Sequence, residues 1–260
     1  MSKVFIQATC RNQALWDATT LVFKTLRTGF PTADIHVAPN GMRLSGSQIV
    51  ELADLVFKID GKQPLLYAQP NPQTTYQDWV CSLIEDENKP FWICDTDMIF
   101  YGNMERFEER FVCPMAGRHT PQFRCPYTRL RTYQRLHTSL LWIDPAAVRD
   151  GAERLRESLV QTPFESYRVD LKTLVSPDVT FHHTERFFHD CCSKLCALVP
   201  NKGFTNEMLD TYTHLNCGTY SDLVDPSGGM TERNRRRMAD PESARGLWRE
   251  QEEWYAARRW

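Results

Sequence analysis

Short apolar runs alternate with helical patterns over about the first hundred residues. The run from Val4 to Ala8 has the length of a buried strand, and the run from Asp34 to Ala38 has the same character. Between these runs, apolar residues recur at helical spacing until Gly29 and Pro31 interrupt the pattern: Leu15, Ala18, Val22 and Leu26. This alternation is typical of a parallel sheet covered by helices. The sequence therefore predicts an α/β fold with a mixed, mostly parallel central sheet flanked by helices.

Two further helical patterns lead to a strongly apolar strand. Ser47 is a suitable N-cap for the first, which Gly61 ends. The second helix places its apolar side chains on one face: Trp79, Val80, Leu83 and Ile84. After Pro90 follows the run Phe91-Trp92-Ile93-Cys94, which we interpret as a fully buried strand.

The second half of the chain is less regular. Its patterns predict a strand over Leu140 to Ile143, a helix over Pro145 to Leu159 and another helix over Phe187 to Leu198. Beyond Val224 the composition changes to a linker-like DPSGG, a basic RNRRR and a helical stripe of large apolar side chains. We therefore expect one domain over residues 1–224, and a basic linker with a C-terminal tail helix over 225–260.

The overall composition excludes several classes of protein. With 42% hydrophobic and 25% charged residues, the 260-residue chain is neither disordered nor fibrous, and its net charge of -2 favours no particular partner. No apolar run approaches the roughly 18 residues that a membrane span needs. The N-terminus also lacks the apolar stretch of a secretory signal, so we expect a cytoplasmic protein without a membrane span.

Two aspartates follow the most apolar strand. Asp95 and Asp97 stand where this strand is expected to leave the sheet, and in open α/β sheets ligands bind at that edge. Two carboxylates so close together repel each other unless a cation or a proton lies between them. A hard divalent ion with oxygen ligands suits this pair and can bridge it to a diphosphate. The alternative is an ordinary solvated strand end.

The order strand, helix, strand, helix, helix, and then an apolar strand ending in Asp-x-Asp resembles the nucleotide-sugar glycosyltransferases of the GT-A fold. The resemblance covers residues 4 to about 220. It implies a Mn²⁺ or Mg²⁺ ion bound by Asp97, with Asp95 contacting the ion or the ribose of a nucleotide-diphosphate sugar such as a UDP-sugar. The ion would assist departure of the nucleotide diphosphate. The acceptor hydroxyl is unidentified.

The resemblance extends to four further positions. Thr9, directly after the first strand, and Thr138 and Ser139, in the strand after the metal motif, are implied to contact the donor. The family more often has Asn and Gly where Thr138 and Ser139 stand. His214 is implied to be a third protein ligand of the ion, since GT-A enzymes often supply a histidine late in the fold. The alternative for His214 is a structural histidine.

Asp190 is the candidate catalytic residue. It follows Phe187-Phe188-His189 and resembles the acid beneath the sugar acceptor, where it would act as general base with inversion or lie near the anomeric carbon with retention. Alternatively, Asp190 is a first-turn acid that complements a helix dipole.

Basic residues suggest an anionic acceptor, such as a hydroxymethylated base in DNA or a phosphorylated glycan. Residues 118–137 contain no acid and five arginines interleaved with aromatic residues: Arg118, Arg124, Arg129, Arg131 and Arg135. A non-catalytic nucleic-acid-binding protein is therefore an alternative. A haloacid dehalogenase-type phosphatase is another, although in that family the acidic strand normally comes first. A crowded set does not match standard zinc-ligand spacing: His182, His183, His189, Cys191, Cys192 and Cys196.

Overall fold

The computed structural model describes residues 2–8, 22–39, 65–66, 76–95, 98–120, 122, 130–160, 171, 179–182, 185–188 and 192–214. These residues fall into two compact units. The first unit contains the described residues up to 66, Trp92–Arg110, and those of 205–214. The second contains those of 76–91 and Phe111–Phe204.

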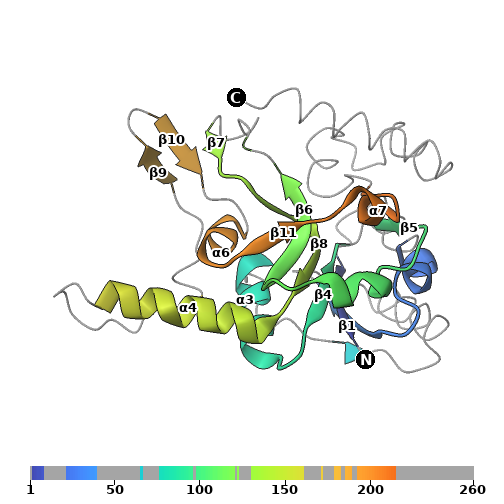
Figure 1. Cartoon of the computed structure of the whole chain (residues 1–260). Helices are drawn as coiled ribbons and strands as arrows, with labels where there is room; N and C mark the ends of the chain where they lie inside the picture. Colours follow the sequence, from blue (N-terminus) through green and yellow to red (C-terminus); the bar gives the residue numbers. More distant parts are fainter. Residues whose placement is uncertain are drawn as a thin grey trace. The chain divides into compact units, whose positions relative to one another are not determined.

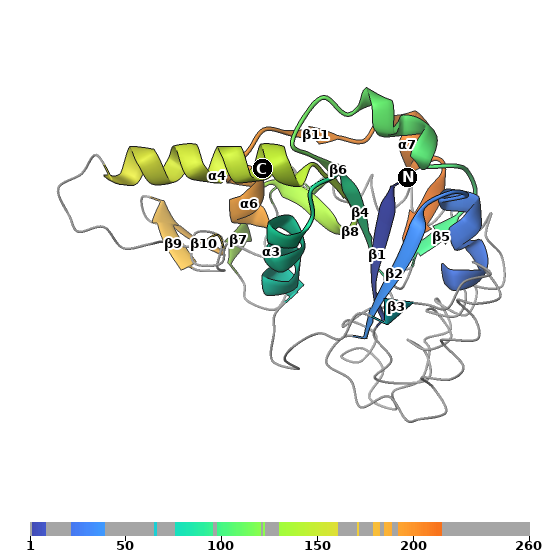
Figure 2. The same cartoon turned by 90° about the horizontal axis from the view of Figure 1, so that it is seen from below.

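Seven strands form one sheet in the order β11-β6-β8-β4-β1-β2-β3 (Figure 1; β2 and β3 are labelled in Figure 2). Their bounds are β1 (Lys3–Ala8), β2 (Asp34–Pro39), β3 (Leu65–Leu66), β4 (Phe91–Cys94), β6 (Met115–Thr120), β8 (Arg135–Ile143) and β11 (Asn201–Gly203). The pairs β1 with β2, β2 with β3, and β11 with β6 are parallel, whereas β8 runs antiparallel to β6. The predicted mixed, mostly parallel sheet is confirmed.

In the first unit, a helical segment packs on a second, two-stranded sheet. β5 (Met98–Phe100) pairs antiparallel with β12 (Tyr212–His214), and Figure 2 shows the helical residues 22–29 beside β5. The ring of Phe100 lies on Gly29, where an added Cβ would come within 2.6 Å of two ring carbons. Glycine at this position therefore lets the helix approach β5 closely.

The 3₁₀ helix η1 (Glu105–Arg110) holds the beginnings of three strands of the first unit. Glu108 accepts hydrogen bonds from Ser2 Oγ at 2.5 Å and from Trp92 Nε1 at 2.6 Å. Ser2 precedes β1 and Trp92 is the second residue of β4, so one carboxylate joins the starts of two neighbouring strands. β1 and β4 therefore run in the same direction, and both end at the opposite edge.

Glu105 binds the backbone directly before β2, the third of these strands. Its carboxylate accepts hydrogen bonds from the backbone N–H of Thr32 at 3.0 Å and of Ala33 at 2.6 Å, just before β2. Arg27 donates from Nη1 to the carbonyl oxygens of Phe30 and Ala33, so it fixes the same turn from the helix side. Burial lowers the pKa of Arg27, although the carboxylate of Glu105 opposes that shift.

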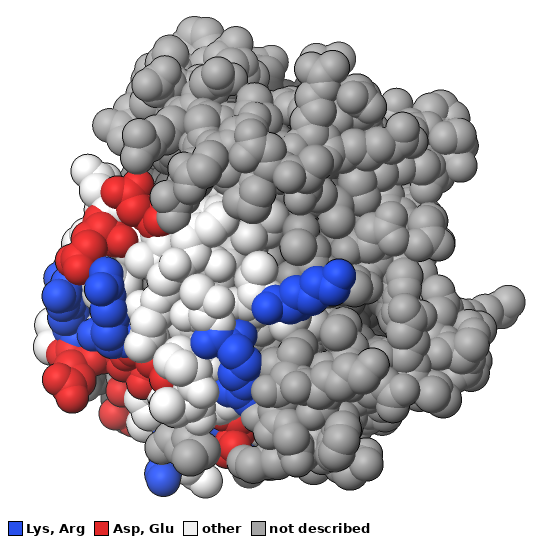
Figure 3. Space-filling view, turned by 90° about the vertical axis from the view of Figure 1, so that its right-hand side faces the viewer, with Lys and Arg blue, Asp and Glu red and all other residues white. Residues whose placement is uncertain are grey.

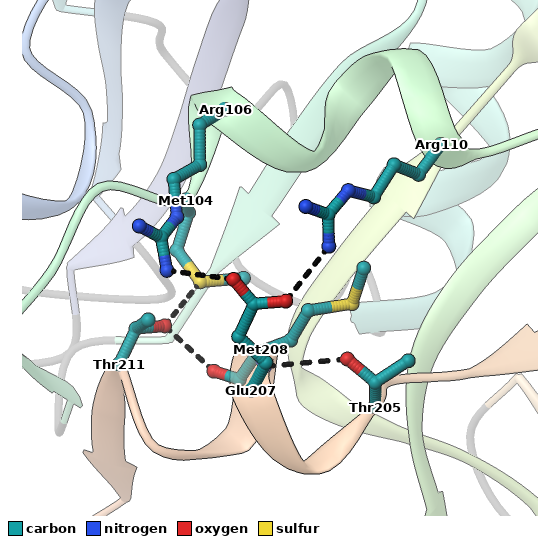
Figure 4. Close-up of polar contacts among 7 residues, drawn as sticks. All are labelled: Met104, Arg106, Arg110, Thr205, Glu207, Met208 and Thr211. Carbon is teal, nitrogen blue, oxygen red and sulfur yellow. Dashed lines mark hydrogen bonds and ion pairs between the residues drawn. The ribbon is translucent and has the colours of Figure 1, made fainter.

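Within the first unit, α7 (Asn206–Leu209) contacts η1, and Figure 4 shows these contacts. Glu207 on α7 forms ion pairs with Arg106 at 3.1 Å and with Arg110 at 2.8 Å, both on η1. The hydrogen bond from Arg110 lowers the pKa of the exposed Glu207 carboxyl. Thr211 donates from Oγ1 to the Met208 carbonyl at 2.6 Å, which ends α7 and directs the chain into β12.

In the second unit, the predicted helices around Trp79 and after Pro145 are confirmed as α3 (Tyr76–Asp86) and α4 (Pro145–Val160). Asp144 accepts hydrogen bonds from the N–H groups of the first turn of α4, as an N-cap residue does. Arg149 donates to the carbonyl oxygens of Ile84 and Glu87 at the end of α3. Arg149 thus joins the two helices, because it binds carbonyl oxygens at the C-terminal end of α3 that have no partner within that helix.

The helix predicted over Phe187 to Leu198 is wrong in its first part. A three-stranded sheet in the order β7-β10-β9 contains β7 (Arg131–Thr132), β10 (Glu185–Phe188) and β9 (Val179–His182). Phe187 packs against Tyr133, with ring centroids 5.0 Å apart, so strand pairing and aromatic packing override the helical pattern. α6 (Ser193–Leu198) begins only after Cys192, whose φ of 60° is left-handed.

Some expectations fall outside the described residues. These are the helix predicted from Ser47, the linker and tail helix over 225–260, and the boundary at residue 224. Among the helices that the structure does describe, none is both long and apolar enough to cross a membrane.

Candidate functional site

The first unit contains a reversal in strand order next to β1. From β1 the chain builds β2 and β3 on one side, and it later places β4 on the other side of β1. In open α/β sheets, ligands bind outside the carboxyl ends of the strands at such a reversal. Asp95 directly follows β4, and Thr9 directly follows β1, although Thr9 lies outside the described residues. The candidate site is therefore the edge at which β1 and β4 end.

The backbone position of Asp95 is fixed by β4, the buried strand that directly precedes it. All four residues of β4 are fully buried, as the apolar run predicts, whereas Asp95 itself is half-buried. The change from buried to accessible occurs within one residue, because the strand leaves the core at Cys94. Thr96 and Asp97 lie outside the described residues.

β12 places His214 opposite β5, the strand that follows the aspartate motif in the sequence. Its register with β5 pairs His214 with Met98, which directly follows Asp97. Consecutive Cα atoms are about 3.8 Å apart, and paired residues of antiparallel strands about 4.5–5.5 Å. The Cα atoms of His214 and Met98 are therefore about 4.5–5.5 Å apart, and Met98 is the residue that follows Asp97 in the sequence.

A carboxylate and a neutral imidazole are both suitable ligands for a divalent ion. A carboxylate and an imidazole project toward an ion from backbones several ångströms away, and Mn²⁺ accepts oxygen and neutral imidazole ligands. His214 is 8% exposed, so water competes little for its ring. Among the described residues alone, no group of three acidic, histidine or cysteine side chains could hold a metal. The proposed set depends on Asp97, which is not among them.

Thr213 offers a test of the packing around this pair of strands. Thr213 is 1% exposed, and its hydroxyl makes no hydrogen bond to any residue that the structure describes. Because an unpaired buried hydroxyl costs free energy, we expect Thr213→Val to raise the free energy of unfolding by about 1 kcal/mol in urea denaturation. Thr25 is the matched control, since its hydroxyl donates to the Val22 carbonyl and accepts from the Phe100 N–H. Thr25→Val should destabilise the protein; stabilisation by both variants, or by neither, would contradict this account.

Thr138 and Ser139 lie in an irregular part of β8, in the second unit. Gly117 and His119 of β6 are two residues apart, but their partners Leu141 and Leu136 on β8 are five residues apart. β8 therefore bulges between Leu136 and Leu141, and bulges are frequent next to active sites. Thr138 is half-buried, whereas Ser139 is buried.

His137, which the sequence analysis did not select, stabilises this bulge. Its Nδ1 atom accepts a hydrogen bond from the backbone N–H of Ser139 at 3.2 Å and lies 2.9 Å from Ser139 Oγ. In a regular sheet, a carbonyl oxygen of the neighbouring strand would accept a hydrogen bond from the Ser139 N–H. At the bulge, the imidazole of His137 accepts it instead. A histidine two residues before a serine in a strand is the only sequence signal of this contact, and it is too common to identify a site.

Asp190 lies outside the described residues, so both interpretations of it stay predictions. Among the described residues, α6 begins at Ser193 with Cys192 as its N-cap. Of the histidine and cysteine set, Cys196 is buried and its Sγ accepts a hydrogen bond from the Leu136 N–H. Burial raises the pKa of Cys196 to about 11, so this thiol stays protonated at neutral pH.

The arginine-rich segment is partly engaged within the protein. Arg118 is 3% exposed on β6, and Arg131 of β7 forms an ion pair with Glu185 of β10 at 3.0 Å. Arg124 and Arg129 lie outside the described residues. On the face shown in Figure 3, basic and acidic side chains of the described residues lie next to one another. Arg118 is therefore not a surface contact for phosphates.

Comparison with known proteins gives only distant likenesses. No protein-family model matches the sequence, and no curated protein matches it. The chain is similar to the glycosyltransferase GlyE of Streptococcus pneumoniae TIGR4, with a TM-score of 0.46, 11% identity and coverage of 80% of this chain. The chain spans 46% of the length of that GlyE structure.

Two further solved structures show similar values. Mouse xyloside xylosyltransferase 1 gives a TM-score of 0.42 at 12% identity, covering 62% of this chain and 73% of that one. A putative glucose-1-phosphate thymidylyltransferase from Bacillus anthracis gives 0.43 at 11% identity, covering 90% and 99%. Glycosyltransferases and a nucleotidyltransferase are thus among the structures that this chain resembles.

Proposed function

We propose that the chain is a metal-dependent glycosyltransferase of the GT-A type, which transfers a sugar from a nucleotide-diphosphate sugar to an acceptor hydroxyl. One observation carries the proposal. Asp95 follows β4 at the reversal of strand order, and β12 pairs His214 with Met98, the residue after Asp97. His214 is thereby paired with the residue that follows the motif, although more than one hundred residues separate the two in sequence.

The residues then take the following roles. Asp97 and His214 hold a Mn²⁺ or Mg²⁺ ion, and Asp95 contacts the ion or the ribose. Thr9, Thr138 and Ser139 contact the nucleotide-sugar, and Asp190 is the acid near the reacting sugar carbon. When bound, the ion supplies Lewis-acid neutralisation of the departing diphosphate.

The protein's own contribution is to hold its ligands in place before the donor arrives. β4 is fully buried, so the backbone before Asp95 cannot swing away. β12 is fully buried as well, and its pairing with β5 fixes the position of the His214 backbone. Ligands on such rigid elements lose little conformational freedom on binding, which favours affinity.

A thermal-shift panel tests the proposed function. Purified protein is melted with UDP-, GDP-, ADP-, CMP- and TDP-sugars, each with Mn²⁺ and each with EDTA. We expect at least one sugar nucleotide to raise the melting temperature with Mn²⁺ and to have little effect with EDTA. If no sugar nucleotide does so, and DNA is bound with a steep salt dependence that does not need Mn²⁺, the nucleic-acid-binding alternative is supported instead.

His214→Ala separates a ligand from a structural histidine. If His214 binds the ion, the variant should bind Mn²⁺ about 10- to 100-fold more weakly, measured by isothermal titration calorimetry, at a nearly unchanged melting temperature without metal. The expectation of unchanged stability follows from the position of His214 at the end of a short strand. A collapse in melting temperature with retained Mn²⁺ affinity would identify a structural histidine.

A further inference from the structure

An exposed histidine stands at the carboxyl end of β6 in the second unit. His119 is the fifth residue of the six-residue strand, and β11 runs parallel beside it, with Gly203 opposite Gly117. β6 and β11 therefore end at the same edge of the sheet, and ligands of α/β sheets bind outside the carboxyl ends of parallel strands. The sequence analysis assigned no role to His119.

The imidazole of His119 is oriented by a neighbouring amide. Gln134 Nε2 lies 3.1 Å from His119 Nδ1, and an amide NH₂ group can only donate. Nδ1 is therefore the acceptor, and the neutral ring carries its proton on Nε2. The result is a single N–H donor of fixed direction on an exposed side chain.

Gly203 provides the space that the ring occupies. A Cβ added at Gly203 would lie 3.1 Å from His119 Cδ2 and 3.3 Å from Cγ, which is closer than carbon atoms normally approach. The ring thus lies against the bare backbone of β11. Gln134 on one side and Gly203 on the other hold an exposed side chain that would otherwise sample several rotamers.

The local irregularity of the sheet supports a binding role. His119 pairs with Leu136, at the point where β8 departs from regular register with β6. The bulge in β8 contains Thr138 and Ser139, the proposed donor-sugar contacts. A bulge re-aims side chains next to a binding site, and His119 lies where the regular pairing resumes.

We propose that His119 binds the acceptor: its Nε2–H donates a hydrogen bond to a hydroxyl oxygen of a carbohydrate. This inference rests on the proposed function and names the acceptor side of the same reaction. One donor of fixed direction matches a sugar hydroxyl, whereas phosphate recognition relies on cationic groups. Arg118 next to His119 is buried, and Lys202, the residue before Gly203, has its side chain on the opposite face of β11. The acceptor class is therefore an uncharged glycan rather than DNA.

The test compares transfer with hydrolysis in His119→Phe, which keeps a planar ring and removes its N–H donor. Transfer is measured with the sugar nucleotide from the thermal-shift panel and a set of neutral mono- and disaccharides. Donor hydrolysis is measured without any acceptor. We expect His119→Phe to raise the acceptor KM about tenfold, the loss typical of one hydrogen bond, while donor hydrolysis stays within twofold of the wild type.

Two further variants keep the test independent of the His119 substitution itself. Gly203→Ala should raise the acceptor KM in the same direction by displacing the ring. Lys202→Gln removes an exposed charge from the adjacent position of β11 and is the matched control, with an unchanged KM. In ¹⁵N NMR spectra, the neutral form of wild-type His119 should show the Nε2–H tautomer, and Gln134→Met should lose that preference.

The outcomes separate the two proposals. If the wild type neither hydrolyses nor transfers any nucleotide-sugar, the proposed function fails and the role of His119 fails with it. If the wild type transfers sugar, but His119→Phe and Gly203→Ala leave the acceptor KM unchanged, only the His119 assignment is overturned. Wild-type transfer to phosphorylated acceptors or DNA, with none to neutral saccharides, would overturn the carbohydrate class.

Discussion

Asp97→Asn is expected to lower Mn²⁺-supported turnover of the nucleotide-sugar by at least about 100-fold, because a neutral amide cannot replace a charged metal ligand. The side chains have nearly the same shape, so the fold should survive. The substitution also removes repulsion between two neighbouring carboxylates, so the melting temperature without metal should stay constant or rise slightly. Turnover is measured as release of the nucleotide diphosphate over a range of Mn²⁺ concentrations.

Asp150→Asn is the matched control for this experiment. Asp150 is exposed on α4 and undergoes the same loss of charge outside the candidate site. Its turnover should equal that of the wild type at every Mn²⁺ concentration. Asp97→Asn with wild-type turnover would remove the central assignment, and equal losses in both variants would point to a general effect of charge.

Phe100→Ala is expected to cause the largest loss of stability, about 3–5 kcal/mol in the free energy of unfolding. Phe100 is 2% exposed and packs against Phe30, with ring centroids 5.2 Å apart, and against Tyr212 at 6.4 Å. Its ring also covers Gly29, which has no side chain to fill the space left behind. The cavity would therefore lie where the helical segment, β5 and β12 meet.

Urea denaturation followed by circular dichroism measures this loss. Val112 is the control, because it is 88% exposed and its truncation to alanine removes little packing. Val112→Ala should change the free energy of unfolding by less than about 0.5 kcal/mol. A comparable, small change in both variants would show that the β5–β12 pair contributes little to the stability of the first unit.

The parts of the fold that the sequence predicted are those with long, consistent apolar patterns. β1, β2, β4, α3 and α4 each carry a periodic or continuous apolar signal, which burial in the structure explains. The run Phe91-Trp92-Ile93-Cys94 is the clearest case, because all four side chains are buried. The apolar pattern of a short segment is sufficient to predict a helix or strand when one face of that element, or all of it, is buried in a core.

Other elements depend on partners distant in sequence. β12 has only three residues, and its strand geometry comes from pairing with β5 about one hundred residues earlier. η1 is specified by its bonds to Ser2, Thr32 and Trp92 rather than by periodicity. The segment at Phe187 resembles a helix until its pairing with β9 is known.

The residues of the candidate site also differ in whether a local sequence pattern could predict their positions. Asp95 was predictable because a buried strand directly precedes it, and His214 only through a family resemblance. The bulge that contains Thr138 and Ser139 has no signature in a single sequence, since it arises from the mismatch between two paired strands. His119 was overlooked because its orientation depends on Gln134 and Gly203, which lie on other segments.

The contacts made by η1 also constrain how the protein can be made. Glu108 bonds Ser2, 106 residues earlier, and Met104, the residue directly before η1, contacts Thr211, 107 residues later. During synthesis on the ribosome, β1 and β4 can therefore assemble around η1 well before β12 emerges. His214, the proposed third metal ligand, would be added last, so a nascent chain acquires its scaffold first and this proposed ligand only when the distal segment has been translated.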